Sequence, residues 1–307
     1  MKNIKIYKNN CRKDVLSGLQ LQKDRLEYNI GKTLFAASDK GNLRENQEDS
    51  VLILEHSNDN NIKLIAVADG VGGYSDGDLA SNSVLKEIIY WFEKTDNFED
   101  LEKTKESLEK LLKNVLQDKD LHIWAATTLS LALITKEKTL IANVGDSRIY
   151  TIKNSVLHKE TKDDSKSEEL LDENVIFSEQ LQRFHKSNNI ITKAITIMPG
   201  NNSLSYKIID NNYDKILAVT DGITDCLSKQ EIEEIINKSN KVNIVSNLVN
   251  ESLIKTSVLE EEIKLLDPTV QKLAEELREI LDDDYYKTIS AGKDNATAAI
   301  YVKKWIK

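Results

Sequence analysis

Acidic residues occur at five places along the chain in local settings suited to metal binding. The settings are RENQED at 44–49, ADGVGG at 68–73, VGDSR at 144–148, TDGITD at 220–225 and GKDNAT at 292–297. Each lies at the end of an apolar run, where a strand would deliver a carboxylate to one rim of a sheet. Carboxylates that converge repel one another and raise one another's pKa unless a cation neutralises them. The pattern therefore predicts a site for divalent metal ions.

One chemistry that two metal ions at such a site can perform is the hydrolysis of phosphate esters. Two divalent ions a few ångström apart can activate a water and neutralise a phosphoryl group during in-line displacement. Mg²⁺ and Mn²⁺ prefer oxygen ligands and retain several waters, so a few carboxylates bind directly and further acids hold waters. Arg44 precedes Glu48 by four residues, and its planar guanidinium can bind two phosphate oxygens at once. The alternative for Arg44 is a surface salt bridge to Glu45 or Glu48.

The elements that would position these residues are strands and helices in alternating groups. Apolar runs typical of strands occupy 50–54, 62–68, 127–134, 139–144, 149–152, 215–219 and 296–302. Short turns, such as 136–138, separate several of them and indicate hairpins, so antiparallel sheets are favoured over a doubly wound parallel sheet. Apolar stripes with helical spacing occupy 78–93, 99–116, 231–236 and 242–254. Each stripe needs a sheet or helix to cover it, which predicts helices outside two packed sheets.

Two segments differ from this pattern. Residues 158–190 are polar and weakly periodic, so we expect an irregular surface segment, called the flap below. Residues 257–287, called the helical insertion, contain a further helix from about 267 to 281, with Asp267 as its cap and Pro268 in its first position. Its apolar stripe consists of Val270, Leu273, Ala274, Leu277, Ile280 and Leu281. Either the outer helices of the same chain or a partner must cover this stripe.

Composition and charge narrow the class of protein. The chain has 307 residues, of which 40% are hydrophobic and 30% charged, as is ordinary for a soluble globular protein. The net charge of -9 argues against sequence-independent nucleic-acid binding and against an anionic membrane surface. Cys11 and Cys226 provide neither a disulfide framework nor a zinc site, which fits a reducing cytoplasm. The sequence shows no signal-peptide pattern and no membrane span.

The five motifs, in this order, resemble those of the type 2C metal-dependent protein phosphatases (the PPM family), in the bacterial serine/threonine branch. The match runs from about residue 35 to 302, and VGDSR at 144–148 is nearly verbatim. SDKG at 38–41 resembles the opening of the first motif, and 162–173 and 191–194 resemble the entry to and exit from the flap. The resemblance implies an α+β fold, a four-layer α/β/β/α sandwich of two mainly antiparallel sheets flanked by helix pairs, with metals at one end.

The resemblance also assigns residues to the metal site. Asp69 corresponds to a bridging ligand, and Gly70 would contribute its backbone carbonyl. The set implied as metal ligands is Glu48, Asp49, Asp69, Gly70, Asp146, Asp221, Asp225 and Asp294. Within this set, Asp221 and Asp294 would complete the ligands of the first ion, and Glu48 and Asp49 would hold the second ion, largely through water. Asp146, with Asp221 and Asp225, matches the position of a third ion in bacterial members.

Each of these residues has a plainer alternative role. An Asp-Gly after a strand is often only a turn, and Glu48, Asp49 or Asp146 could cap or hydrogen-bond within turns. Asn295 is expected to hold the geometry of its neighbours. Cys226 is expected to pack in the interior rather than bind metal, because a thiolate is a poor ligand for hard ions.

The departures from the family pattern bear on mechanism. Val71 stands where many eukaryotic relatives have a histidine, so protonation of the leaving group must come from metal-bound water or solvent. Ala126 replaces the usual glycine before Thr127. The segment before Asp294 is longer than in compact bacterial relatives.

The function implied is a cytoplasmic protein serine/threonine phosphatase, with Arg44, Asp69 and Asp221 as its catalytic residues. It would hydrolyse phosphoserine and phosphothreonine by direct attack of metal-activated water, using two Mn²⁺ or Mg²⁺ ions and a possible third. Its partners would be phosphoproteins made by a serine/threonine kinase, without nucleic acid or membrane, and it would act as a monomer. The expected organisation is one phosphatase domain over 1–307, with an N-terminal extension to about 30, the flap and the helical insertion.

Three alternatives stay open at this point. The first is a catalytically weak or inactive member of the same fold that binds partners, although Asp69, Asp221 and Asp294 are all present. The second is a structural protein whose acids only solvate its surface. The third is a small-molecule phosphatase. The absence of a Cys-x5-Arg loop disfavours cysteine-based phosphatase chemistry.

Overall fold

The computed structural model describes residues 11–17, 25–56, 59–71, 76–95, 97–117, 120–198, 202–277, 281 and 283–303. The expected N-terminal extension to about 30 is therefore described only in part. Gly72, Gly73 and Ile280 of the expected motifs lie outside the described residues.

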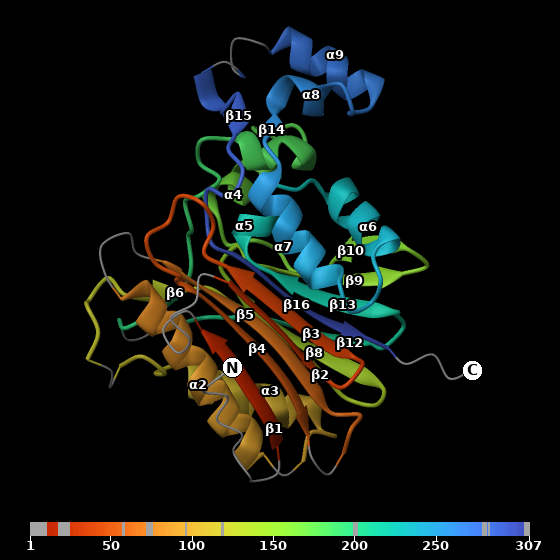
Figure 1. Ribbon diagram of the computed structural model, residues 1–307. Coiled ribbons are helices and arrows are strands. Elements are labelled where there is room, and N and C mark those ends of the chain that lie inside the picture. The colour runs from red at the N-terminus through yellow and green to blue at the C-terminus, as the bar shows by residue number, and fades with distance from the viewer. Residues whose placement is uncertain are drawn as a thin grey trace.

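Two sheets form the centre of the molecule (Figure 1). The first sheet runs in the order β1 (Cys11–Ser17), β4 (Asp49–His56), β5 (Lys63–Val71), β7 (Leu129–Ile134), β8 (Lys138–Val144) and β12 (Ser205–Asp210), with β6 (Ala126–Thr127) and β11 (Ile195–Thr196) beside it. The second runs in the order β10 (Val156–Lys159), β9 (Arg148–Lys153), β13 (Lys215–Val219), β16 (Ala296–Val302), β3 (Leu34–Asp39) and β2 (Arg25–Ile30). All these pairings are antiparallel.

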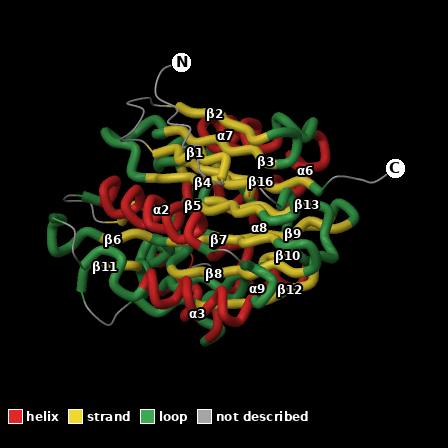
Figure 2. Tube along the Cα trace, turned by 90° about the horizontal axis from the view of Figure 1, so that it is seen from below, coloured by secondary structure: helices red, strands yellow, loops and turns green. Residues whose placement is uncertain are grey.

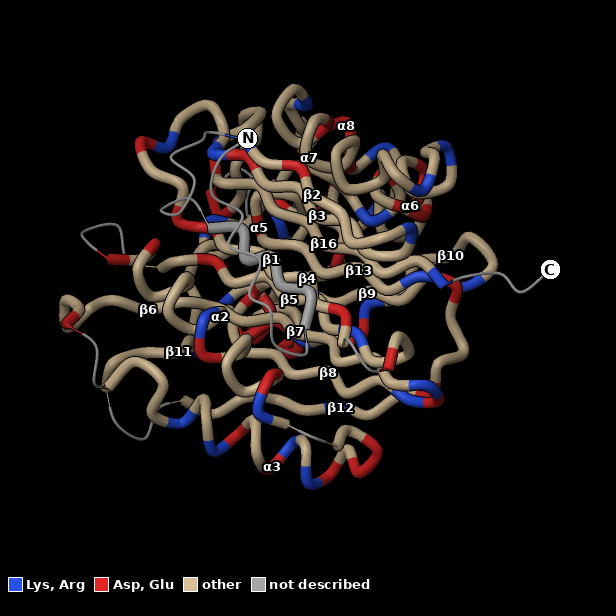
Figure 3. Tube along the Cα trace, turned by 60° about the horizontal axis from the view of Figure 1, so that its bottom comes forward, with Lys and Arg blue, Asp and Glu red and all other residues tan. Residues whose placement is uncertain are grey.

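Helix pairs cover the outer faces of both sheets (Figures 1 and 2). The helices α2 (Gly77–Lys94) and α3 (Leu101–Leu112) pack on the first sheet, and α6 (Lys229–Lys238) and α7 (Ile244–Ile254) lie on the second. Lys and Arg alternate with Asp and Glu along the outside of α3, as expected of a solvent-facing surface (Figure 3). The expected four-layer α/β/β/α sandwich is confirmed.

Strand β4 shows how the sequence builds these layers. Leu52 and Leu54 pack under α2 and α3, whereas Val51 and Ile53 pack between the sheets, and all four are fully buried. Successive side chains of a strand point to opposite faces, so a strand buried on both sides is apolar throughout. The continuous apolar run at 50–54 is therefore the mark of a central strand.

Local capping sets the ends of several helices. Asp100 accepts a hydrogen bond from the backbone N–H of Lys103 at the start of α3. Ser228 and Glu231 form a reciprocal capping box, so α6 begins at Lys229, earlier than the expected helix.

Two expectations about local structure were wrong. The run at 127–134 is not one strand, because it divides at Thr128: β6 pairs with the end of β5, and β7 pairs along the rest of it. The flap is not irregular: it contains α4 (Lys166–Asp172) and the 3-10 helix η1 (Glu179–Phe184). Leu181 and Phe184 of η1 are fully buried. Their apolar contacts order a segment whose polar composition indicated a loop.

The helical insertion lies beyond α7, at the top of Figure 1. It comprises β14 (Ser257–Val258), α8 (Leu259–Ile263) and α9 (Pro268–Glu276), and β14 pairs with β15 (Thr288–Ile289), which follows the insertion. The cap at Asp267 is confirmed, since its side chain accepts from Thr269 N–H, but α9 ends at Glu276, earlier than expected. Among the described residues, no helix has the length and apolar character needed to cross a bilayer.

Candidate active site

The antiparallel pairing of β4 and β5 places two of the expected acids opposite each other. In this register Asp49 is the partner of Asp69. Thr128, where the strand run divides, holds the backbone of Asp69 through two hydrogen bonds. Its N–H donates to the carbonyl of Asp69 at 2.8 Å, and its hydroxyl accepts from the Asp69 N–H at 3.0 Å. The carbonyl of Glu48 accepts from the Gly70 N–H at 3.2 Å. The first sheet thus fixes one half of the acidic site.

The second sheet provides the other half. Asp221 starts the short helix α5 (Asp221–Thr224) just after β13, and Asp294 lies two residues before β16. Thr220 lies between the sheets: its N–H bonds the carbonyl of Thr297 at 3.1 Å, and its hydroxyl donates to Oδ2 of Asp49 at 2.8 Å. The hydroxyl of Thr220, to which the sequence analysis assigned no role, therefore joins the two halves.

Burial and mutual repulsion raise the pKa values of these carboxyls. Burial raises the pKa of Asp69 well above its usual range, and the charges of Asp221 and Asp49 add to the effect. Burial likewise raises the pKa of Asp49 to about 8. The pKa of Asp221 is well above its usual range through burial and then through Asp294. Each causal charge belongs to the expected ligand set, which shows that these side chains lie close enough to interact.

Several of the carboxylate oxygens are buried without a partner. Among the described residues, Oδ1 of Asp49, of Asp146 and of Asp221 makes no hydrogen bond. A buried carboxylate is costly unless a cation or donor compensates it. These oxygens would be compensated by a cation, and a hard divalent ion suits an all-oxygen donor set.

Asp146 and Asp225 lie at the edge of this group. Burial raises the pKa of Asp146 to about 7, with Asp163 and Asp225 as the next causes. Asp225 is already paired, since Asn188 donates to its Oδ1 at 2.7 Å and Lys293 lies 2.7 Å from its Oδ2. The motifs did not indicate Asn188, which comes from the flap.

Arg44 forms an ion pair that the sequence did not predict. Its Nη2 lies 2.6 Å from Oδ2 of Asp294, and its Nη1 lies 3.7 Å from Oε2 of Glu48. Burial lowers the pKa of Arg44, but the hydrogen bond and charge of Asp294 outweigh it and the pKa is raised overall. Burial raises the pKa of Glu48. The pair with Glu48, which was the alternative interpretation of Arg44, is present, and the shorter contact with Asp294 joins the first and last motifs.

The acidic side chains are gathered but not yet arranged as ligands. Among the described residues, no group of three or more His, Cys, Asp or Glu side chains could hold a metal ion as placed. The hydrogen bonds explain part of this, because Arg44 occupies Asp294, Thr220 occupies Asp49 and Lys293 occupies Asp225.

Two glycines let the backbones approach at the site. A Cβ on Gly70 would lie 2.3 Å from the carbonyl carbon and oxygen of Gly77, at the start of α2. A Cβ on Gly222 would lie 1.9 Å from the carbonyl oxygen of Asn295. The Asp-Gly pairs are therefore more than ordinary turns, because the site closes only without a side chain there.

Asn295 has the supporting role expected of it. Its Oδ1 accepts from the Glu48 N–H at 2.7 Å, and its Nδ2 donates to the carbonyls of Lys40 and Asn46 at 2.7 and 3.0 Å. Cys226 is buried and free, as expected, and burial raises the pKa of its thiol to about 11.

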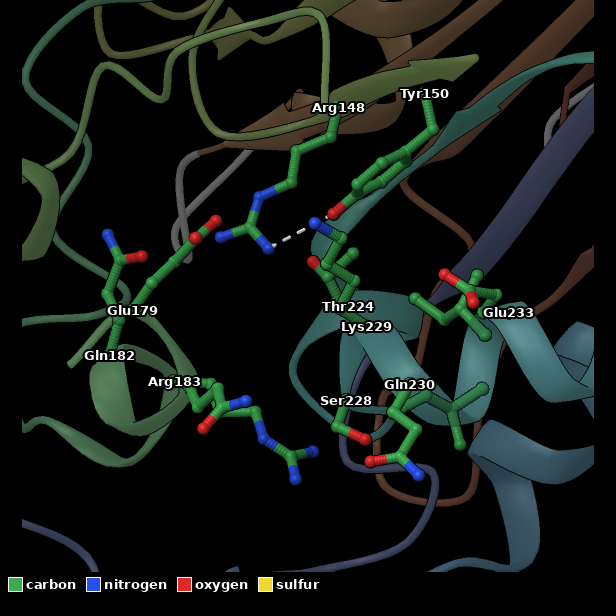
Figure 4. A pocket seen from close by; sticks show the side chains of 13 residues that line it. Arg148, Tyr150, Glu179, Gln182, Arg183, Thr224, Ser228, Lys229, Gln230 and Glu233 are labelled. Atoms are coloured by element: carbon green, nitrogen blue, oxygen red, sulfur yellow. Dashed lines mark hydrogen bonds between the residues drawn. The ribbon is translucent and has the colours of Figure 1, made fainter. Parts of the chain in front are cut away.

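A pocket of about 280 Å³ lies between the flap and the start of α6 (Figure 4). Glu179, Gln182 and Arg183 of the flap form one side, and Ser228 and Gln230 at the start of α6 lie across from them. Arg148 extends between the two sides, and its Nε bonds Oδ2 of Asp163 at 2.8 Å. Thr224, another lining residue, immediately precedes Asp225 in the chain. One lining residue is thus the chain neighbour of Asp225, whereas none of the expected metal ligands lines the pocket.

Comparison with known proteins decides the family. The family model described as protein phosphatase 2C matches residues 43–282, which is more than half of the chain. The chain belongs to the protein phosphatase 2C family. The serine/threonine phosphatase stp of Listeria monocytogenes is 31% identical over 211 residues, covering 65% of this chain and 81% of that protein.

Solved structures of this phosphatase family share the fold. A bacterial serine phosphatase superposes with a TM-score of 0.68 and 24% identity, covering 89% of this chain and 98% of that one. The catalytic domain of the serine/threonine protein phosphatase PstP, in complex with two manganese ions, gives a TM-score of 0.61 at 22% identity, covering 88% and 96%. Family and fold together confirm the resemblance read from the motifs and the expectation of a phosphoprotein phosphatase.

Proposed function

We propose that this protein phosphatase 2C member hydrolyses phosphoserine and phosphothreonine in proteins at the junction of its two sheets. The observation that carries the proposal is the set of buried, unpartnered carboxylate oxygens of Asp49, Asp146 and Asp221. Surface acids that merely solvate the molecule would not be buried there. The relative from Listeria monocytogenes is named a serine/threonine phosphatase, which supports phosphoproteins as the substrates.

The proposed cofactors are two divalent ions, Mn²⁺ or Mg²⁺. When bound, the ions would lower the pKa of a water and offset the charge of the phosphoryl group. Their ligands would be Glu48, Asp49, Asp69, Asp221 and Asp294, with the carbonyl of Gly70. A third ion would lie near Asp146 and Asp225. The neighbouring PstP structure with two manganese ions supports this number.

The protein's own residues position the reaction. Asp69 and Asp221 come from opposite sheets, so we infer that each sheet contributes one of these two carboxyls to the metal site. Asp49 is held by the hydroxyl of Thr220 and would keep that orientation throughout. With several carboxyls close together, the pKa values of Asp69 and Asp221 are raised until cations compensate the charge.

Arg44 would bind the substrate phosphate. Its side chain is 43% exposed, so a phosphate can reach it, and its contact with Asp294 is a pair that incoming cations and phosphate would replace. A guanidinium released in this way offers two parallel N–H groups to two phosphate oxygens. The exposed position thus fits a group that exchanges partners during binding.

The proposed organisation is a single phosphatase domain over the whole chain, with the flap and the helical insertion as additions to the core. We further propose that the protein reverses a serine/threonine kinase in the cytoplasm and acts as a monomer.

The experiment that tests the substrate class measures phosphate release from three kinds of substrate. They are a phosphothreonine protein, p-nitrophenyl phosphate and a small sugar phosphate, each with Mn²⁺ present. We expect the highest kcat/KM for the phosphoprotein, and Asp69→Asn serves as the control that removes turnover on all three. A higher kcat/KM for the sugar phosphate would replace the proposal with a small-molecule phosphatase.

A further inference from the structure

The flap and the helical insertion meet at one buried charged residue. Arg183 of η1 is 7% exposed, and its Nη2 lies 2.7 Å from Oε2 of Glu262 in α8, which is also buried. Its Nη1 donates to Oγ of Ser257 at 3.3 Å. The guanidinium also stacks over the ring of Phe184, 4.9 Å from its centroid. One flap side chain therefore holds two points of the insertion.

The same guanidinium reaches the acidic group. Nη1 of Arg183 donates to the backbone carbonyl of Asp225 at 3.2 Å. Ser257 supports this contact from the insertion side, because its hydroxyl donates to the carbonyl of Cys226 at 2.8 Å. Further along the flap, Asn188 donates to the Asp225 carboxylate at 2.7 Å. The planar, multivalent guanidinium is suited to linking three elements at once.

Backbone pairing adds a second connection between flap and insertion. The N–H of Tyr286 bonds the carbonyl of Phe184 at 2.7 Å, and the N–H of Lys186 bonds the carbonyl of Asp284 at 2.8 Å. The rings of His185 and Tyr285 meet edge to face, with centroids 5.0 Å apart. The flap between η1 and Asn188 is thus held from both ends of the insertion.

Apolar packing joins the two segments as well. Leu181 and Phe184 of the flap share one core cluster with residues of the insertion, namely Leu259, Leu266, Ala274, Leu281 and Tyr285. This packing supplies general stability, and it would persist if one charge were removed. The ion pair contributes something different, because removing one partner leaves the other as an uncompensated buried charge.

We propose that Arg183 is a positioning residue, through which the helical insertion holds the flap side of the pocket in register with Asp225. Arg183 lines that pocket on the flap side, opposite Ser228 and Gln230. If the insertion releases it, the pocket wall shifts while the acidic group on the strands stays in place. The kinetic consequence rests on the proposed function, since it concerns how a phosphoprotein binds beside the acidic group.

The test uses Glu262→Gln, which removes the charge and keeps the shape, and Arg183→Met, which removes the guanidinium. Glu276→Gln is the matched control, because Glu276 lies in the same insertion and pairs with Lys272 at 3.8 Å on the exposed surface of α9. Amide hydrogen exchange is measured in EDTA, so that it depends on neither metal nor activity. KM and kcat are then measured with Mn²⁺ for a phosphothreonine protein and for p-nitrophenyl phosphate.

For Glu262→Gln and Arg183→Met we expect exchange at 179–193 to rise about tenfold or more, as the loss of one charged hydrogen bond implies, while β5 and β16 stay protected. KM for the phosphoprotein should rise several-fold, and kcat for p-nitrophenyl phosphate should change less than about twofold. The control should match the wild type in both measurements.

Unchanged exchange at 179–193 would overturn the proposal, and so would raised exchange without any rise in the phosphoprotein KM. Absence of activity in the wild type would refute the proposed function, while the exchange result would still decide whether the insertion holds the flap. If both variants unfold throughout, exchange of the wild type in mild urea decides instead. The free energy of opening, obtained from amide exchange, should then be the same for η1 and α8. Different opening free energies for these two helices would refute the coupling.

Discussion

Replacing Asp146 by Asn should stabilise the metal-free protein, and the gain should grow with pH. The carboxyl is 6% exposed, and its pKa is raised from 3.8 to about 7, chiefly by burial. Below its unfolded pKa the group is neutral in both states and costs nothing. Above that value the unfolded chain loses the proton first, so the folded state becomes progressively less stable until its own pKa is passed. Roughly three pKa units at about 1.4 kcal/mol each give a cost of about 4 kcal/mol at alkaline pH.

The assay is urea unfolding of wild type and Asp146→Asn in EDTA at two pH values. At about pH 5.5 the cost of the wild-type carboxyl is about 2 kcal/mol, and at about pH 8.5 it is about 4 kcal/mol. The advantage of the variant should therefore widen by about 2 kcal/mol between these conditions. Mn²⁺ should stabilise the wild type more than the variant, because the ion offsets the same charge. Parallel pH profiles for the two proteins would refute the claim that this carboxyl is buried at a cost.

Three further changes test other parts of the site. Arg44→Ala should raise KM for a phosphopeptide about tenfold, as expected for the loss of a phosphate contact, and steady-state kinetics with unchanged KM would leave Arg44 as a surface ion pair only. Gly222→Ala should lower the free energy of unfolding by about 1–3 kcal/mol, because its Cβ would meet the Asn295 carbonyl, and an unaltered thermal midpoint would contradict that packing. Deletion of 257–287 should leave the chain poorly folded by circular dichroism, since the insertion shares a core with the flap; a well-folded deletion would show that this core is dispensable.

The sequence predicted the acidic site because its residues are tied to strand ends. Asp49 and Asp69 flank apolar runs of a central hairpin, and strand register alone brings such residues opposite each other. The glycines next to Asp69 and Asp221 marked places where only a bare backbone fits. Patterns of this kind involve only neighbouring residues in the sequence, so they can be recognised without knowing which distant residues they contact.

Other contacts depend on partners far away in the chain. The ion pair of Arg44 with Asp294 joins residues from the first and last motifs, and periodicity gives no sign of it. The flap was expected to be irregular because its polar residues outnumber its apolar ones, yet Leu181 and Phe184 are enough to fix it. The sequence showed the apolar stripe of the insertion but not the residues that pack against it. These include flap residues that no helical period identifies.

Phosphate release from a phosphothreonine peptide, followed while the metal is removed and restored, tests the central claim most directly. The account predicts that turnover stops in excess EDTA and returns on adding Mn²⁺ or Mg²⁺, and that Asp69→Asn stays inactive although it remains folded. Turnover that persists in excess EDTA, or an Asp69→Asn variant as active as the wild type, would contradict the assignment of this carboxylate group as a divalent-metal phosphatase site.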